Sequence, residues 1–299
     1  MIPAYGTNGL TDHRIDDALH LLADLGYGGV ALTLDHAHLD PFAPDVARRT
    51  AHVARLLAEC GLAVVIETGA RYLLDPRRKH HPTLVSDDGR ERRTDLLLRA
   101  VEIAVDLGAP VVHLWSGILP EGVSDDVAWG RVLTTLEPVL DAADRAGVTL
   151  AVEPEPGMFL ERAADVDELL GRAGRPENLR MTLDLGHLTC NEADPVDVVR
   201  TYGPLVAHVQ VDDMRRGVHE HLELGDGEVD LPPLLAGLAA AGYPGLLSVE
   251  LARHNHAAPR VATSSLAAVR EAAATAGVAL GGAREEHRNV STTTERTPA

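Results

Sequence analysis

The chain has 299 residues, 45% of them hydrophobic, and a formal net charge of −18. That is enough apolar material for the core of one large domain or two ordinary ones, and the acidic balance repels nucleic acid phosphates. The two cysteines fit neither a CxxC metal site nor a disulfide framework, no apolar run reaches membrane-spanning length and the first residues lack a signal-peptide pattern, so we expect a soluble, cytoplasmic protein with no nucleic acid and no membrane as partner.

Short apolar runs of strand length recur along the chain. In chain order they are IPAYGTN (2–8), GVALTLD (29–35), AVVIETG (63–69), PVVHLWSG (110–117), TLAVEPE (149–155), MTLDLGH (181–187), AHVQVDD (207–213) and GLLSVEL (245–251). Between them lie segments with apolar residues at helical spacing, and many of these segments end at a glycine, namely Gly26, Gly61, Gly108, Gly147 and Gly242. A strand followed by a helix, repeated in this way, predicts a single-domain α/β protein with the (β/α)8 TIM barrel fold. A doubly wound open sheet is the weaker alternative, because the sequence contains no GxGxxG turn.

The longest stretch between predicted elements covers residues 71–92 and is rich in basic residues. It follows the third predicted strand, on the side where barrel active sites lie, so we interpret it as a functional loop. No linker divides the chain. We therefore expect residues 1–280 to form the barrel, and the polar, Thr-rich residues 281–299 to form a disordered tail.

Polar residues gather at the carboxyl ends of the last four predicted strands. They are Glu153 and Glu155 on the fifth strand, Asp184 and then His187 on the sixth, Gln210, Asp212 and Asp213 on the seventh, and Glu250 on the eighth. Because these strand ends converge on one axis in a barrel, we expect the side chains to meet. Their oxygens are the ligands that Mg²⁺ and Mn²⁺ prefer, so the pattern indicates a divalent metal site.

Four motifs occur in a fixed order, and they are VEPEPG (152–157), LDLGHL (183–188), HVQVDDM (208–214) and a stretch over 221–251 that begins HLELGDGEVD. On these motifs, residues 1–280 resemble the xylose isomerase-like barrel superfamily, the sugar phosphate isomerase/epimerase group. The resemblance implies four metal ligands, here Glu153, Asp184, Gln210 and Glu250. Members that isomerise or epimerise ketoses have a histidine where this chain has Gln210. An amide oxygen can bind a hard cation, so Gln210 is either a ligand for Mn²⁺ or Mg²⁺ or a residue that hydrogen-bonds substrate in a metal-free protein.

The resemblance implies a metal-dependent sugar or sugar phosphate isomerase or epimerase that works through an enediolate. Glu153 and Glu250 would act as the acid/base pair, and His187 would donate a hydrogen bond to a substrate oxygen, unless it is a core histidine bonded to backbone. The same enediolate can expel a β-hydroxyl, so an inosose dehydratase-like lyase acting on a cyclitol is one alternative. A barrel that binds a metabolite without turnover is another, although the presence of both glutamates favours an enzyme.

Basic residues follow three of the predicted strands on the expected active face. Their convergence in an acidic protein favours a sugar or cyclitol that carries a phosphate or carboxylate group. The expected substrate contacts are Arg71, Trp115, His208, Arg216, His221 and Arg253. Of these, Trp115 either stacks on a sugar ring or packs in the core, and His221 either contacts substrate or fixes its own loop by a hydrogen bond.

AP endonucleases belong to the same superfamily, and their three-zinc site needs further histidines on three strands. The matching positions here are Gly69, Trp115 and Gln210. Although His219 and His221 match the loop that helps hold the extra zinc, the missing histidines and the negative charge argue against an endonuclease. Relatives often associate through their helices, so a homo-oligomer is compatible with the resemblance.

Overall fold

The computed structural model describes residues 1–282, in which parallel strands close into a barrel. The barrel strands are β1 (Ile2–Gly6), β2 (Gly29–Thr33), β3 (Ala63–Glu67), β4 (Val111–Trp115), β5 (Thr149–Glu153), β6 (Leu179–Asp184), β7 (Val206–Val211) and β10 (Leu246–Val249). Each pairs with its neighbour in chain order, and β10 closes the ring against β1. The predicted (β/α)8 barrel is therefore confirmed. A short antiparallel hairpin, β8 (Asp213–Arg215) and β9 (Val218–Leu222), follows β7 outside the barrel and was not expected.

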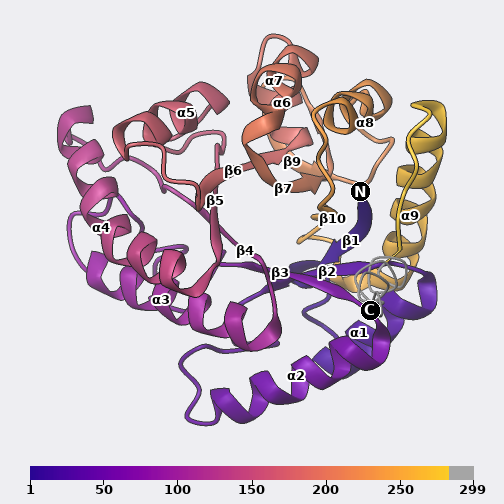
Figure 1. Ribbon diagram of the computed structural model, residues 1–299, viewed down its shortest axis with the longest axis horizontal. Coiled ribbons are helices and arrows are strands. Elements are labelled where there is room, and N and C mark those ends of the chain that lie inside the picture. The colour runs from indigo at the N-terminus through magenta and orange to yellow at the C-terminus, as the bar shows by residue number, and fades with distance from the viewer. Residues whose placement is uncertain (283–299) are drawn as a thin grey trace, which may run out of the picture.

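Helices surround the strands (Figure 1). They are α1 (Ile15–Leu25), α2 (Val46–Cys60), α3 (Arg90–Leu107), α4 (Asp125–Ala146), α5 (Ala163–Arg172), α6 (Leu185–Asn191), α7 (Pro195–Tyr202), α8 (Leu231–Ala240) and α9 (Ala258–Thr275). The first four end at a glycine in the left-handed conformation, as the sequence predicts. At the end of α8 the capping residue is Ala241, and the left-handed Gly242 comes one residue later.

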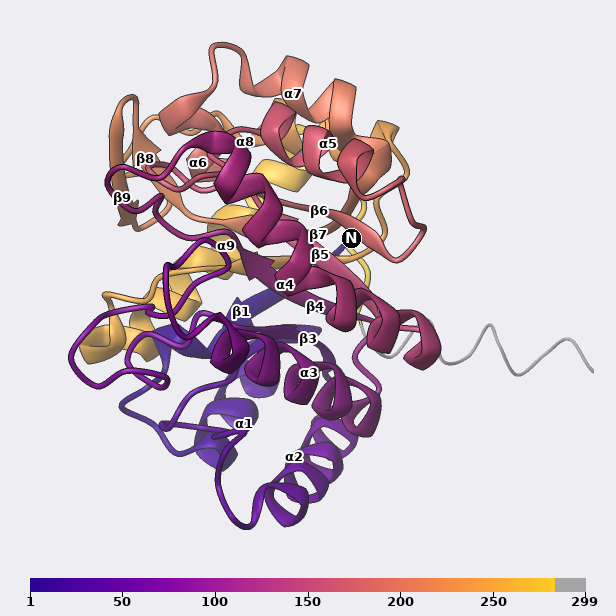
Figure 2. The same ribbon diagram turned by 90° about the vertical axis from the view of Figure 1, so that its left-hand side faces the viewer.

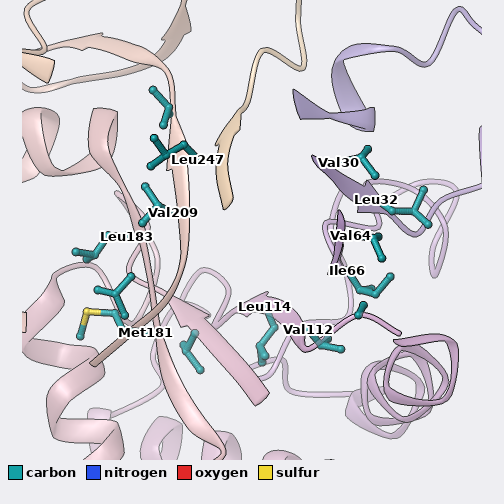
Figure 3. Close-up of a cluster of buried hydrophobic side chains, with 14 of the residues drawn as sticks. Val30, Leu32, Val64, Ile66, Val112, Leu114, Met181, Leu183, Val209 and Leu247 are labelled. Atoms are coloured by element: carbon teal, nitrogen blue, oxygen red, sulfur yellow. The ribbon is translucent and has the colours of Figure 1, made fainter. Parts of the chain in front are cut away.

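The outer faces of the barrel strands are aliphatic and pack against the helices. Figure 3 shows part of this layer, including Val64 and Ile66 of β3 and Val112 and Leu114 of β4. The same buried cluster contains helix residues such as Leu97. Because side-chain direction alternates along a strand, the residues between these ones point into the barrel.

The interior of the barrel changes character along the strands. Near the amino ends it holds a separate apolar cluster, which includes Val65, Val111 and Ala151. Two residues farther along β3, β4 and β5, on the same strand faces, stand Glu67, His113 and Glu153, and all three are buried. A polar layer therefore lies inside the barrel at the carboxyl ends of the strands, where a site can be built on rigid elements.

The β8–β9 hairpin lies at the upper left of the molecule in Figure 2, beyond the barrel strands. Among the residues that the structure describes, no helix is long and apolar enough to cross a membrane. The tail predicted for residues 281–299 falls outside the described residues, except for Gly281 and Gly282. The backbone N–H of Gly281 donates to the carbonyl of Met1 at 2.9 Å.

Candidate active site

A cavity of about 150 Å³ lies at the carboxyl ends of the barrel strands. Side chains from both halves of the barrel form its wall, and those at or next to strand ends are Thr33, Glu67, Trp115, Glu153, Gln210 and Glu250. Loops add further groups, among them Asn8, Arg71, Lys79, His187, His221 and Arg253. Of the four expected metal ligands, Glu153, Gln210 and Glu250 therefore line one cavity, and Asp184 is not among its lining residues.

Glu153 lies between two imidazoles. Its Oε2 is 2.7 Å from Nε2 of His113, and its Oε1 is 3.1 Å from Nδ1 of His187. Burial alone would raise the pKa of Glu153, but the positive charge and hydrogen bond of His113, with the nearby His187, lower the pKa well below its ordinary value. Glu153 is therefore held as a carboxylate.

Asp184 ends β6 and caps the short helix α6. Its Oδ1 accepts the backbone N–H of His187 at 2.9 Å, which fixes the histidine beside Glu153. Oδ2 of Asp184 is buried and has no hydrogen-bond partner among the described residues, and the 3.1 Å contact between Glu153 Oε1 and His187 Nδ1 lacks hydrogen-bond geometry. Donor atoms of the three side chains lie within 4.8 Å of one another. Buried, unsatisfied donors at this spacing fit a divalent cation.

Gln210 bridges two carboxylates. Its Nε2 donates to Oε2 of Glu250 at 2.5 Å and to Oε1 of Glu67 at 3.1 Å, while its own Oε1 is buried and has no partner in the described part of the chain. Asn8 Nδ2 donates to the other oxygen of Glu250 at 2.8 Å. Burial and the charge of Glu67 raise the pKa of Glu250 well above its ordinary value. Glu250 thus lies beside the cavity but outside the compact group of Glu153, Asp184 and His187.

His208 is not among the residues that line the cavity, and it lies on β7 two residues before Gln210, toward the amino end of the strand. The side chain is fully buried, and its Nε2 is 3.6 Å from Oε1 of Glu67. Thr33 donates to the other oxygen of Glu67 at 3.0 Å. Burial would raise the pKa of Glu67, but the neighbouring imidazoles of His208 and His113 lower the pKa. From the sequence we expect His208 to bind substrate, but it is not among the residues that line the cavity and lies beside Glu67 instead.

The sequence analysis missed Glu67, His113 and Asn8. Glu67 ends β3 as Glu153 ends β5, so reading the end of the third strand in the same way would have found it. His113 lies opposite Glu67 in the β3–β4 register. Strand alternation also places it inside the barrel, two residues before Trp115. Asn8 lies two residues after β1, and its place at the cavity and its contact with Glu250 mark it as part of the site.

Most of the other expected substrate contacts lie at the cavity. Arg71, Trp115, His221 and Arg253 line it, and Trp115 is in edge contact with His80 at a centroid distance of 5.0 Å. Arg216 is the exception. Its Nη1 donates to the carbonyl of Glu192 at 3.1 Å, and the residue lines a different pocket, beside α7 and α8.

The long loop before α3 is tied to the barrel by a buried arginine. The guanidinium of Arg93 donates to the carbonyls of Thr68, His80 and Pro82 at 3.1, 2.8 and 2.8 Å. Burial lowers the pKa of Arg93 to about 9. Within the loop, Lys79 reaches the cavity. Arg78 instead pairs with Asp75 at 2.7 Å, so the basic residues of this loop do not all face the cavity.

The β8–β9 hairpin brings two more histidines to the cavity. Nε2 of His219 is 3.2 Å from Nε2 of His187, and Nδ1 of His221 lies in close contact with Oδ2 of Asp212. Burial and the neighbouring His187 lower the pKa of His219 to about 4. Burial and the charge of Asp184 raise the pKa of Asp212 well above its ordinary value.

Comparison with curated proteins finds sugar isomerases and epimerases. The 2-oxo-tetronate isomerase of Cupriavidus necator is 28% identical over 172 residues, which cover 56% of this chain and 62% of that protein. The L-ribulose-5-phosphate 3-epimerase of Salmonella paratyphi C is 28% identical over 196 residues, which cover 64% of this chain and 68% of that protein. The chain spans 58% to 62% of the length of the first three curated relatives it matches.

Solved structures share the fold. An L-ribulose 3-epimerase superposes with a TM-score of 0.74 at 21% identity, and the superposition covers 99% of this chain and 99% of that one. The IOLI protein with a bound zinc atom superposes with a TM-score of 0.75 at 14% identity and covers 92% of this chain and 99% of that one. Residues 19–273 match the model of one protein family, and the chain therefore belongs to the xylose isomerase-like TIM barrel family.

Proposed function

We propose that the protein is a carbohydrate isomerase or epimerase that works through an enediolate with the help of a divalent cation. The observation that carries the proposal is that Glu153 and Glu250 line one small cavity, from β5 and from the end of β10. Relatives named as a 2-oxo-tetronate isomerase and an L-ribulose-5-phosphate 3-epimerase support this class of reaction.

Both reactions begin with removal of a proton from a carbon next to a carbonyl group. A carboxylate on one side of the sugar takes the proton, and an acid returns it to the neighbouring carbon or to the other face. Glu153 is fixed by His113, and Glu250 is fixed by Asn8 and Gln210, so neither carboxyl group has to be ordered when substrate arrives. These two side chains are the acid and base of the proposal.

Glu153, Asp184 and His187 would hold the cation, with the free Oε1 of Gln210 as a further oxygen donor. When bound, a divalent cation polarises the carbonyl and spreads the negative charge of the enediolate. Two carboxylates and an imidazole suit Mn²⁺ better than Mg²⁺, because Mg²⁺ favours all-oxygen ligands.

The cavity wall also carries positive charge. Arg71, Lys79 and Arg253 line it from three different loops, whereas the protein as a whole is acidic. Local cations of this kind favour a sugar or cyclitol that bears a phosphate or a carboxylate group. Trp115 offers an apolar surface to the same compound.

The test is exchange of substrate hydrogen with solvent. The protein, loaded with Mn²⁺, is incubated in D₂O with a panel of ketoses, sugar phosphates and inososes, and deuterium next to the carbonyl is measured by NMR. We expect incorporation with at least one anionic sugar, and loss of incorporation in Glu250→Gln. Loss of a β-hydroxyl from the product would instead indicate a lyase. Absence of exchange with every compound that binds would support a barrel without turnover.

A further inference from the structure

Two adjacent aspartates at the end of β7 have opposite environments. Asp213 accepts backbone N–H groups on both oxygens, at 2.8 to 3.0 Å, from Met214, Gly225, Gly227 and Val229. Asp212 is fully buried, and neither of its oxygens has a hydrogen-bond partner among the described residues. A buried carboxylate without hydrogen bonds is costly, and the close contact of Asp212 with Nδ1 of His221 lacks hydrogen-bond geometry, so Asp212 needs a further partner.

The atoms around Asp212 are unsatisfied as well. Within residues 1–282, Oδ2 of Asp184 and Nδ1 of His221 have no hydrogen-bond partner, and one donor atom from each of the three side chains lies within 4.8 Å of the others. Nδ1 of His221 contacts Oδ2 of Asp212 closely without hydrogen-bond geometry. Three donors that approach each other without bonding to each other are arranged as ligands around a shared cation.

Gly186 makes room for this arrangement. A Cβ atom at that position would lie 1.8 Å from Oδ1 of Asp212. The backbone of Gly186 is not in the left-handed region, because the residue lies within α6. A glycine is therefore needed here because it leaves space for the Asp212 carboxylate, and not because the backbone conformation requires it.

We infer that Asp184, Asp212 and His221 bind a divalent transition-metal cation. This site shares only Asp184 with the group formed by Glu153, Asp184 and His187. Two carboxylate oxygens and one imidazole nitrogen suit Zn²⁺, Mn²⁺ or Co²⁺. The cation would join β6, β7 and β9, and so hold the hairpin that carries His219 at the cavity.

The test counts bound metal and uses no substrate, so its result does not depend on the proposed reaction. The full-length protein is stripped with EDTA, loaded with Co²⁺ and freed of excess, and cobalt per chain is measured by elemental analysis and by visible absorption. We expect Asp212→Asn and His221→Asn each to bind one Co²⁺ fewer per chain than the parent. The absorption band of Co²⁺ that is lost in Asp212→Asn should still be present in Glu153→Gln, because Glu153 is not a ligand of this site.

His219→Asn is the matched control, because His219 lies on the same strand, two residues from His221. His187, His219 and His221 also have donor atoms within 4.8 Å of one another, so they form the competing ligand set. If His219→Asn loses the Co²⁺ and Asp212→Asn keeps it, the histidines are the ligands and the inference is wrong. If Asp212→Asn keeps the cobalt content of the parent, Asp184 and Asp212 share a proton instead, and the inference is again wrong.

Folding is checked by circular dichroism and thermal melting. Co²⁺ should raise the melting temperature of the stripped parent, and the rise should be smaller in Asp212→Asn and in His221→Gln. His221 is only partly buried, so its variants keep the test valid if Asp212→Asn does not fold. An equal rise in the parent and in a folded His221→Gln variant would overturn the inference.

Discussion

Gln210 donates its amide nitrogen to Glu250 at 2.5 Å, and the same nitrogen lies 3.1 Å from Glu67 across the barrel interior. An ionised carboxylate only accepts hydrogen bonds, and Glu67, whose pKa is lowered, is held in that form. The N–H side of the amide therefore faces Glu67, and the carbonyl oxygen has no hydrogen-bond partner among the described residues. The sequence predicts that Gln210 either binds the cation through its amide oxygen or hydrogen-bonds substrate. The contact of its nitrogen with two carboxyl groups gives it a third role, which is to connect β3 to the end of β10.

Replacing Gln210 with His tests whether residue 210 contacts the cation. An imidazole is a softer donor than an amide oxygen, so Gln210→His should shift metal preference from Mn²⁺ or Mg²⁺ toward Co²⁺ or Zn²⁺. Competition titrations against the parent measure the shift. An unchanged preference would mean that the residue acts only through Glu67 and Glu250.

Replacing Glu250 with Gln removes a proposed acid/base group and keeps its shape. We expect deuterium exchange to fall by about 10²–10⁴-fold, the range typical for loss of a general acid or base. The melting temperature should change little, because Asn8 can turn its unpartnered Oδ1 toward the new amide nitrogen while Gln210 still donates to the amide oxygen. Glu168→Gln on the exposed face of α5 makes the same chemical change away from the cavity and should be silent. Activity within a few fold of the parent would remove Glu250 from the mechanism.

His113 is predicted to act on the cation through Glu153. It holds Oε2 of that carboxylate at 2.7 Å and so leaves Oε1 oriented toward Asp184 and His187. His113→Phe should weaken Mn²⁺ binding by about 10- to 100-fold, as is usual when a group that orients a metal ligand is lost. Equilibrium titration measures the affinity, and His113→Gln, which keeps an N–H donor, should recover part of it. Equal affinity in the parent and the Phe variant would show that Glu153 does not need this support.

The basic loop should contribute to binding through single residues. Lys79 and Arg253 line the cavity, whereas Arg77 does not. Lys79→Met and Arg253→Met should therefore raise KM for an anionic sugar with little change at saturation, and the difference should shrink with added salt. Arg77→Met is the control. If all three variants match the parent toward every anionic compound, the substrate is a neutral sugar or cyclitol.

Arg93 is predicted to matter for stability. Without its guanidinium, the carbonyls of Thr68, His80 and Pro82 lose their donor, and each buried carbonyl left unpaired costs about 1–3 kcal/mol. Arg93→Met should lower the free energy of unfolding measured with urea by at least one such amount. Arg99→Met, at a partly exposed position farther along the same helix, leaves those three carbonyls paired and should lower it less. Equal losses in both variants would point to a general effect on α3.

The barrel could be predicted from the sequence because its signals are local. Each strand is a short aliphatic run, and helices α1 to α4 end at the glycines that the sequence marks. Strand ends also gave Glu153, Asp184, Gln210 and Glu250, since parallel strands in a barrel present those ends at one face. Each of these predictions depends only on the order of residues within one segment of the chain.

Contacts between segments could not be predicted in the same way. That the amide of Gln210 faces Glu67 depends on how β7 and β3, which are not neighbours in the barrel, place their side chains across its interior. The β8–β9 hairpin was missed because its sequence, with Arg216 at the turn and His219 and His221 on one strand, is charged and lacks an apolar face. For the same reason the sequence placed Arg216 near the substrate, whereas the turn carries it away.

The three carbonyls held by Arg93 belong to the beginning and the middle of the loop before α3, so this wall of the cavity is set when the protein folds. A ligand then meets a finished surface and does not have to order the loop on binding. The rate of ligand association should accordingly be limited by diffusion and charge, and not by closure of this segment. Compounds too large for the cavity should not bind, because the loop does not shift to make room for them.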